Sequence, residues 1–234
     1  MSRTAALVPA AGRGERLGPG APKALRPLGG SPVLVHAVRA LSLARGVDVV
    51  VIAAPEADVD SVRTLLSGVV EDAELIVVAG GDTRQSSVAR ALLALPADVD
   101  VVLVHDAARP LVPVEMVERV VVAVRSGEDA VIPVLGMVDT IKTIDADGRV
   151  VATPDRSILR AVQTPQGFQR SVLQQAHAEA EIDDVTDDAG LVERRGVTVS
   201  TVPGHEEAFK ITRPLDLVLA EAVLSRRRAG GVVA

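Results

Sequence analysis

The sequence has no cysteine, tryptophan or tyrosine, and phenylalanine occurs only twice among its 234 residues. Without cysteine there can be no disulfide scaffold, no cysteine-ligated zinc or iron–sulfur centre and no cysteine nucleophile. An aromatic content of 1% also argues against a surface on which nucleic-acid bases stack. The hydrophobic core must therefore be built from valine, alanine, leucine and isoleucine.

Long apolar runs and an excess of positive charge are also missing. No stretch approaches the roughly 18 to 20 uncharged apolar residues of a membrane-spanning helix, and the start of the chain lacks the pattern of a signal peptide. The 25 basic and 31 acidic residues are mixed along the chain and give a net charge of −6. This balance is not typical of a nucleic-acid binder or of a disordered acidic tail. We therefore expect a cytoplasmic protein that binds neither membranes nor nucleic acids.

Short β-branched segments alternate with longer helical patterns along the chain. Strands are expected at residues 4–8, 47–53, 74–79, 99–105, 130–134 and 197–202, and several are continuously apolar, as is typical of strands buried on both faces. Helices are expected at residues 32–44, 57–66, 84–95, 113–126, 171–181 and 214–228, the first capped by Ser31. This alternation predicts one Rossmann-like α/β domain over residues 1–234, with a mostly parallel twisted sheet and helices on both of its faces.

Residues 138–153 depart from this alternation. They form two alternating segments around Asp147-Gly148, which is a hairpin signal. A late hairpin is not expected to extend a parallel sheet, so we interpret residues 137–156, approximately, as a projecting β-arm. Taken alone, this segment is typical of a solvated hairpin with ordinary surface charges, although its apolar side chains need a cover.

A glycine-rich segment follows the first expected strand. It reads Pro9-Ala10-Ala11-Gly12-Arg13-Gly14-Glu15-Arg16-Leu17-Gly18 and is followed by Pro22-Lys23. Small residues at a strand end let backbone N–H groups hold a phosphate. The dinucleotide-binding fingerprint would need glycine in place of Leu17, and a Walker A loop would need serine or threonine in place of Ala24. The remaining interpretations are a cradle in which Arg16 and Lys23 hold a polyanion, or an ordinary turn with solvated charges.

Six further motifs follow in order along the chain. They are Gly80–Val88, Val104–Pro110, Asp139–Lys142, Gln163–Gln166, Thr186–Ala189 and Phe209–Pro214. Together with the glycine-rich loop they make residues 4–224, approximately, resemble the 2-C-methyl-D-erythritol 4-phosphate cytidylyltransferase family of the non-mevalonate isoprenoid pathway. The resemblance implies a nucleotidyltransferase that joins CTP and 2-C-methyl-D-erythritol 4-phosphate to give CDP-methylerythritol and pyrophosphate. Three alternatives stay open: ribitol 5-phosphate as the acceptor, an NAD(P)-dependent reductase, and a non-catalytic nucleotide-binding module.

The resemblance also implies roles for individual residues. Its catalytic residues are Arg16, Lys23, Arg156 and Lys210. Its nucleotide-binding residues are Ala10, Ala11, Gly12, Gly14, Gly81, Asp82, Ser87 and Ala107. Its substrate-binding residues are Asp106, Arg109, Thr140, Thr164 and Thr186. The resemblance also implies a homodimer, in which the arm completes the polyol-phosphate pocket of the second subunit and its apolar side chains are covered.

The reaction class sets which side chains are needed. The attacking group is already a phosphate oxygen, so catalysis should rest on positioning and on charge neutralisation by arginine, lysine and a divalent cation. Asp106 follows an expected strand and is the candidate ligand for Mg²⁺ or another divalent cation, with a turn-capping role as the alternative. Asp82 has the same kind of alternative, as a residue at a helix start. We expect Phe168 and Phe209 to pack in the interior, so that cytosine is recognised by hydrogen bonds.

Overall fold

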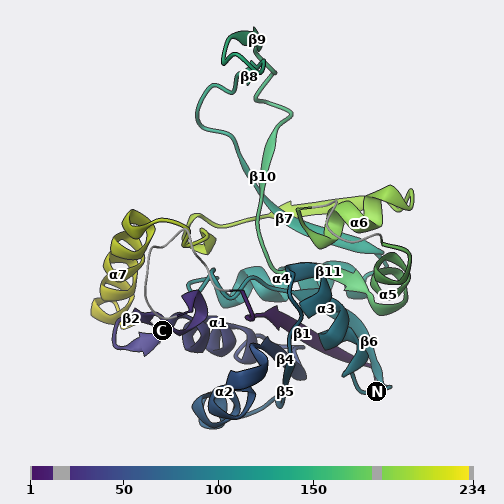
Figure 1. Ribbon diagram of the computed structural model, residues 1–234, viewed down its shortest axis with the longest axis vertical. Coiled ribbons are helices and arrows are strands. Elements are labelled where there is room, and N and C mark those ends of the chain that lie inside the picture. Colours follow the sequence, from purple (N-terminus) through teal and green to yellow (C-terminus); the bar gives the residue numbers. More distant parts are fainter. Residues whose placement is uncertain (1, 13–21, 181–185, 232–234) are drawn as a thin grey trace.

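The computed structural model describes residues 2–12, 22–180 and 186–231 of the chain (Figure 1). Its helices are α1 (Val33–Ser42), α2 (Val59–Leu66), α3 (Arg84–Leu93), α4 (Val114–Arg125), α5 (Arg170–Glu179), α6 (Asp188–Arg194) and α7 (Pro214–Ala229). Short 3-10 helices lie at Lys23–Leu25, Glu56–Asp58 and Glu206–Ala208. In the part of the chain that is described, no helix combines the length and the apolar character needed to cross a membrane.

One sheet of eight strands forms the centre of the molecule. Its strands are β1 (Arg3–Pro9), β4 (Val49–Ala54), β5 (Glu74–Ala79), β6 (Val99–Val104), β7 (Ala130–Gly136), β10 (Arg160–Val162), β11 (Gln166–Gln169) and β12 (Val199–Pro203). The order is β10-β7-β11-β6-β1-β4-β5, with β12 beside β7. β1 runs parallel to β4 and β6, and β12 runs parallel to β7, whereas β11 runs antiparallel to both β6 and β7. The predicted α/β domain with a mostly parallel sheet is therefore confirmed.

The alternation of small aliphatic residues along the strands sends side chains to two cores. On β1, Ala6 and Val8 join the core formed with α1, α2 and α4, whereas Ala5 and Leu7 join the core formed with α3, α5 and α6. A third, smaller cluster lies under α7 and includes Leu28 and Ile211. Phe168 is fully buried and Phe209 packs partly buried against this third cluster, as expected from the sequence.

Two strands of the central sheet and one helix were not expected from the sequence. β10, β11 and α6 are short, and β11 consists of Gln-Gly-Phe-Gln, which has too little apolar periodicity to indicate a strand. The expectation that Ser31 caps the first helix is wrong. Ser31 lies in the short hairpin of β2 (Pro27–Leu28) and β3 (Ser31–Pro32), and α1 begins after Pro32.

The segment between β7 and β10 projects from one end of the molecule as an arm (Figure 1). At its tip, β8 (Thr143–Ile144) pairs antiparallel with β9 (Val150–Ala152), which is a shorter pairing than the sequence indicates. The turn between them is closed by Asp145, whose carboxylate accepts hydrogen bonds from the backbone N–H groups of Asp147 and Arg149. Several apolar side chains of the arm are exposed, namely Val138, Ile144, Val150, Val151 and Ile158.

The contact between α4 and β11 gives a first prediction. A Cβ atom added at Gly167 would lie 2.5 Å from Cγ1 of Val120 and 2.9 Å from Cγ2 of Val124. We expect Gly167→Ala to lower the free energy of unfolding by about 1–3 kcal/mol, because α4 must move away from the sheet. Urea unfolding followed by circular dichroism measures this change. Gly136→Ala in β7 is the control, since a Cβ there meets nothing within 4 Å; equal stability of the two variants would contradict the prediction.

Candidate functional site

A cavity of about 260 Å³ opens where β1, β5 and β6 end at their carboxyl termini. From β1 the chain continues to β4 on one side, while β6 lies on the other side. Such a reversal of strand order leaves a crevice at the carboxyl ends of parallel strands, and ligands of open α/β sheets bind there. The site lies in this crevice.

Small residues form the side of the cavity near β1 and β5. Ala10, Ala11 and Gly12 follow β1, and Gly81 follows β5. The two loops touch, because a Cβ atom added at Gly80 would lie 2.6 Å from Cβ of Ala11. A ligand in this part of the cavity meets backbone groups and methyl groups rather than long side chains.

The start of α3 orders the loop after β5. Thr83 is the N-cap, and its hydroxyl oxygen accepts a hydrogen bond from the backbone N–H of Ser86. Asp82 is therefore not the cap; it is exposed and lines the cavity. The hydroxyl of Ser87 accepts a hydrogen bond from the Gly81 backbone N–H at 3.0 Å and lies 2.8 Å from the Thr83 carbonyl, which ties the loop to the helix.

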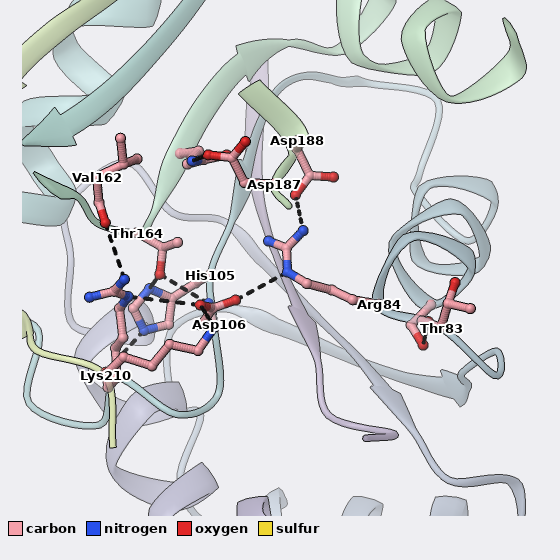
Figure 2. Close-up of polar contacts among 12 residues, drawn as sticks. Thr83, Arg84, His105, Asp106, Val162, Thr164, Asp187, Asp188 and Lys210 are labelled. Carbon is pink, nitrogen blue, oxygen red and sulfur yellow. Dashed lines mark hydrogen bonds and ion pairs between the residues drawn. The ribbon is translucent and has the colours of Figure 1, made fainter. Parts of the chain in front are cut away.

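Asp106 lies two residues after β6 and is surrounded by three cationic side chains (Figure 2). Its Oδ2 is 2.7 Å from Nζ of Lys210 and 3.8 Å from Nε of Arg109. Its Oδ1 is 3.2 Å from Nε of Arg84. Burial alone would raise the pKa of Asp106, but Arg84, Lys210 and Arg109 hold it well below its usual range. Asp106 is thus a carboxylate at any physiological pH.

A buried threonine and histidine support the backbone of Asp106. The Asp106 backbone N–H donates to Oγ1 of Thr164 at 3.0 Å, and the same Oγ1 lies 3.1 Å from Nδ1 of His105. Burial lowers the pKa of His105 to about 4, so the ring is neutral near pH 7. Its Nε2 lies 3.1 Å from the Arg109 carbonyl, which only accepts, so Nε2 carries the hydrogen and Nδ1 accepts from Thr164.

Arg109 braces the two segments that bear Thr164 and Lys210. Its Nη1 donates to the Ala208 carbonyl at 2.7 Å, and its Nη2 donates to the Val162 carbonyl at 3.3 Å. Its buried Nε faces Asp106 without a hydrogen bond of its own. Arg109 therefore joins the β10 end, the Lys210 segment and the end of β6.

The structure gathers most of the site residues expected from the sequence. Those on the cavity wall are Ala10, Ala11, Gly12, Lys23, Gly81, Asp82, Ser87, Asp106, Ala107 and Lys210. Arg109 and Thr164 lie behind Asp106. Of the described residues, Thr140, Arg156 and Thr186 do not line this cavity: the first two are exposed on the arm, and Thr186 is exposed before α6. Gly14 and Arg16 lie outside the described residues.

Three residues of the site were not singled out from the sequence. Arg84 bridges Asp106 and Asp188, with its Nη1 2.6 Å from Oδ2 of Asp188. His177 of α5 contacts the other oxygen of Asp188 at 2.9 Å. Arg84 belongs to the Gly80–Val88 motif and Asp188 to the Thr186–Ala189 motif, so the motifs themselves pointed to both residues. Their spacing does not indicate that they pair, because they are 104 positions apart.

The cavity can take a divalent cation only if the ligand supplies part of the coordination. In the described ranges, no group of three or more histidine, cysteine, aspartate or glutamate residues could hold a metal ion. Asp106 offers one carboxylate, already compensated by Lys210 and Arg84. Mg²⁺ is commonly held by one or two carboxylates together with phosphate oxygens and water, and this donor set fits that arrangement.

Comparisons with known proteins give one consistent result. The family model described as 2-C-methyl-D-erythritol 4-phosphate cytidylyltransferase matches residues 4–226. The chain is 58% identical to the protein of that name from Streptomyces coelicolor, over 97% of this chain and 87% of the relative. It is 61% identical to the one from Frankia casuarinae, over 96% of this chain and 82% of the relative. The crystal structure of 4-diphosphocytidyl-2C-methyl-D-erythritol synthase from Anaerococcus prevotii superposes with a TM-score of 0.84 at 30% identity, covering 96% of this chain and 99% of the other.

The neutral, buried His105 predicts that acid weakens the fold before the carboxylates titrate. An unfolded chain protonates histidine below about pH 6.5, whereas the folded protein keeps His105 neutral down to a pKa of about 4. The free energy of unfolding should therefore fall between these two pH values, by roughly 3 kcal/mol in all from this residue. Urea unfolding at several pH values, followed by circular dichroism, measures the slope.

His105→Asn is the matched variant for that measurement. It should flatten the slope between pH values of about 6.5 and 4, while His36, whose pKa is also lowered by burial, still contributes in the same direction. An unchanged slope in His105→Asn would show that the proton uptake belongs to other groups.

Proposed function

The chain belongs to the 2-C-methyl-D-erythritol 4-phosphate cytidylyltransferase family, and we propose that the cavity around Asp106 is where it carries out this reaction. It is a nucleotidyltransferase of isoprenoid precursor synthesis that uses CTP and a phosphorylated sugar alcohol. The observation that carries the placement is the combination of a small-residue loop with Lys23 and Lys210 around one cavity. Such a cavity suits a ligand with several phosphates.

The reaction exchanges one phosphate bond for another. A phosphate oxygen of 2-C-methyl-D-erythritol 4-phosphate attacks the α-phosphorus of CTP, and the bond from that phosphorus to the bridging oxygen of the departing pyrophosphate breaks. No proton has to be removed from the attacking group. The protein therefore has to align the attacking phosphate, the α-phosphate and the departing pyrophosphate, and to neutralise their negative charge.

The residues on the cavity wall divide between these tasks. We propose that Ala10, Ala11, Gly12 and the Gly81–Ser87 segment bind the nucleotide, with hydrogen bonds rather than aromatic stacking recognising cytosine. We propose that Lys23, together with Arg16 outside the described residues, neutralises the phosphates of CTP. Lys210 holds the attacking phosphate, and Ala107 lies against the ribose.

Thr164 and Arg109, which were expected to bind the substrate, do not line the cavity. The hydroxyl of Thr164 is buried and already engaged with Asp106 and His105, so its contribution is to hold Asp106. Arg109 uses its two terminal nitrogens on carbonyl groups, and its buried Nε faces Asp106. Contacts of Thr186 with the polyol remain a prediction.

Asp106 is the residue that we propose as the protein's ligand to Mg²⁺. The cation would supply charge neutralisation for the triphosphate, whose oxygens complete its coordination. Because Asp106 is held ionised by its neighbours, it can ligate a cation without losing a proton first.

The arm is proposed to complete the active site of a second subunit in a homodimer. Thr140 and Arg156 lie on the arm and not on the cavity wall of their own chain within the described residues. The exposed apolar residues of the arm, such as Val150 and Val151, need a partner surface. The cytoplasm, where nucleoside triphosphates are abundant, is the proposed location.

The acceptor is tested by measuring pyrophosphate release with CTP and each candidate polyol phosphate in turn. We expect turnover with 2-C-methyl-D-erythritol 4-phosphate that exceeds turnover with ribitol 5-phosphate by at least about 100-fold in kcat/KM, since a site that pairs with specific hydroxyl groups rejects an acceptor that leaves them unpaired. ATP, GTP and UTP in place of CTP, and EDTA in place of Mg²⁺, are the controls. Turnover with ribitol 5-phosphate alone would refute the assignment.

Subunit mixing tests whether the arm acts on its partner. Arg156→Ala and Lys210→Ala should each be inactive, but a mixed dimer contains one site in which both residues are unaltered. Co-refolded in equal amounts, the two variants should recover about a quarter of wild-type activity, since half of the dimers are mixed and each has one intact site. Each variant refolded alone is the control. Absence of recovery in verified mixed dimers would mean that the arm serves its own chain.

A further inference from the structure

Arg84 connects two carboxylates that come from different parts of the fold. It is the first residue of α3, Asp106 follows β6, and Asp188 begins α6. Figure 2 shows the guanidinium reaching between them, with Nε 3.2 Å from Oδ1 of Asp106 and Nη1 2.6 Å from Oδ2 of Asp188. We propose that Arg84 and Asp188 are positioning residues that together fix the Asp106 carboxylate for nucleotidyl transfer. This inference rests on the proposed function of the cavity.

Asp188 is placed to hold Arg84 and not to meet a substrate. Its side chain is only 1% exposed, and its two oxygens are used by Arg84 and by Nε2 of His177. Burial would raise the pKa of Asp188, yet Arg84 and His177 keep it below its usual value, so the carboxylate is charged. A buried carboxylate without its cation is strongly destabilising, which keeps the guanidinium in this position.

The orientation of Asp106 depends on having a different partner on each oxygen. Lys210 and Arg109 both face Oδ2, whereas Arg84 holds Oδ1. The terminal torsion of an aspartate is broad, so a carboxylate held from one oxygen alone can turn about its axis. Because a guanidinium is planar and rigid, fixing its Nη1 on Asp188 also fixes the direction of its Nε toward Asp106.

The same arginine couples two sides of the cavity. Arg84 directly follows Gly81, Asp82 and Thr83, which line the cavity at the proposed nucleotide side. Through Arg84, the loop after β5 is connected to the carboxylate at the end of β6. A nucleotide that orders this loop would also act on the position of Asp106.

The kinetic test compares Arg84→Gln, Arg84→Lys and Asp188→Asn with the wild type. We expect Arg84→Gln and Asp188→Asn to lower kcat by about 10- to 100-fold, because small misplacements of a reacting group have effects of this size. The KM for CTP should change less than about 3-fold if the loss concerns the transition state. Arg84→Lys keeps the charge but cannot bridge both carboxylates, so it should recover only part of the activity.

A double-mutant cycle separates positioning from direct contact with the substrate. In an Asp106→Asn background, Arg84→Gln should change kcat by less than about 2-fold, since Arg84 then has no carboxylate to position. Additive effects would overturn the inference. So would an effect of Arg84→Gln that Asp188→Asn does not share.

Arg3→Gln is the control for the loss of a bridging arginine at the surface. Arg3 also bridges two carboxylates, but those of Glu74 and Asp98 are 48% and 55% exposed, whereas those of Asp106 and Asp188 are 10% and 1% exposed. Urea unfolding of both variants therefore accompanies the kinetic comparison and checks that each variant is folded in the assay. It lies at the amino end of β1, away from the cavity. We expect Arg3→Gln to retain kcat within about 2-fold, and an equal loss in both variants would indicate general destabilisation.

A crystal structure of Arg84→Gln tests the inference without any substrate. We expect the Asp106 carboxylate to turn away from its wild-type orientation while the backbone of β6 stays in place. An unmoved carboxylate refutes the positioning role even if the enzyme has the proposed activity. A turned carboxylate upholds that role even if the acceptor proves to be a different polyol phosphate.

Discussion

Removing a carboxylate from water costs several kcal/mol unless cations and hydrogen-bond donors replace its hydration, and the elements around the cavity are arranged to meet that cost at Asp106. Arg84 arrives from α3, Lys210 from the segment before α7, and Arg109 from the loop after β6. Two of these cations are themselves held elsewhere, Arg84 by Asp188 and Arg109 by two carbonyl groups. Asp106 therefore joins segments that are distant in sequence.

The aromatic-poor composition suits this arrangement. A sheet whose strands bear valine and alanine on both faces lets helices and loops approach closely, as at Gly167 under α4. The residues that line the cavity near β1 are also small, so Ala10, Ala11 and Gly12 leave backbone groups accessible. Rigidity comes from the two cores, and under the proposed function recognition is left to the backbone and to a few charged side chains.

The sequence predicts the parts of this structure that depend on local pattern. Apolar periodicity is sufficient for β1, β4, β5, β6 and β7, and the position of Asp106 after a buried strand follows from it. The four residues of β11 carry two glutamines and a glycine, and their strand conformation comes from pairing with β6 and β7. The partnership of Arg84 with Asp188 arises when two helices meet across 104 positions, and no local rule contains it.

The 2.7 Å contact between Lys210 and Asp106 makes the carboxylate an internal competitor for the ammonium group. In the proposed role of Lys210, an incoming phosphate would share the ammonium group with a carboxylate that already engages one of its three N–H donors. Lys210 would then hold a substrate phosphate and a product phosphate alike with only part of its donor capacity. Under the proposed function, this sharing would favour release of the product over its tight retention.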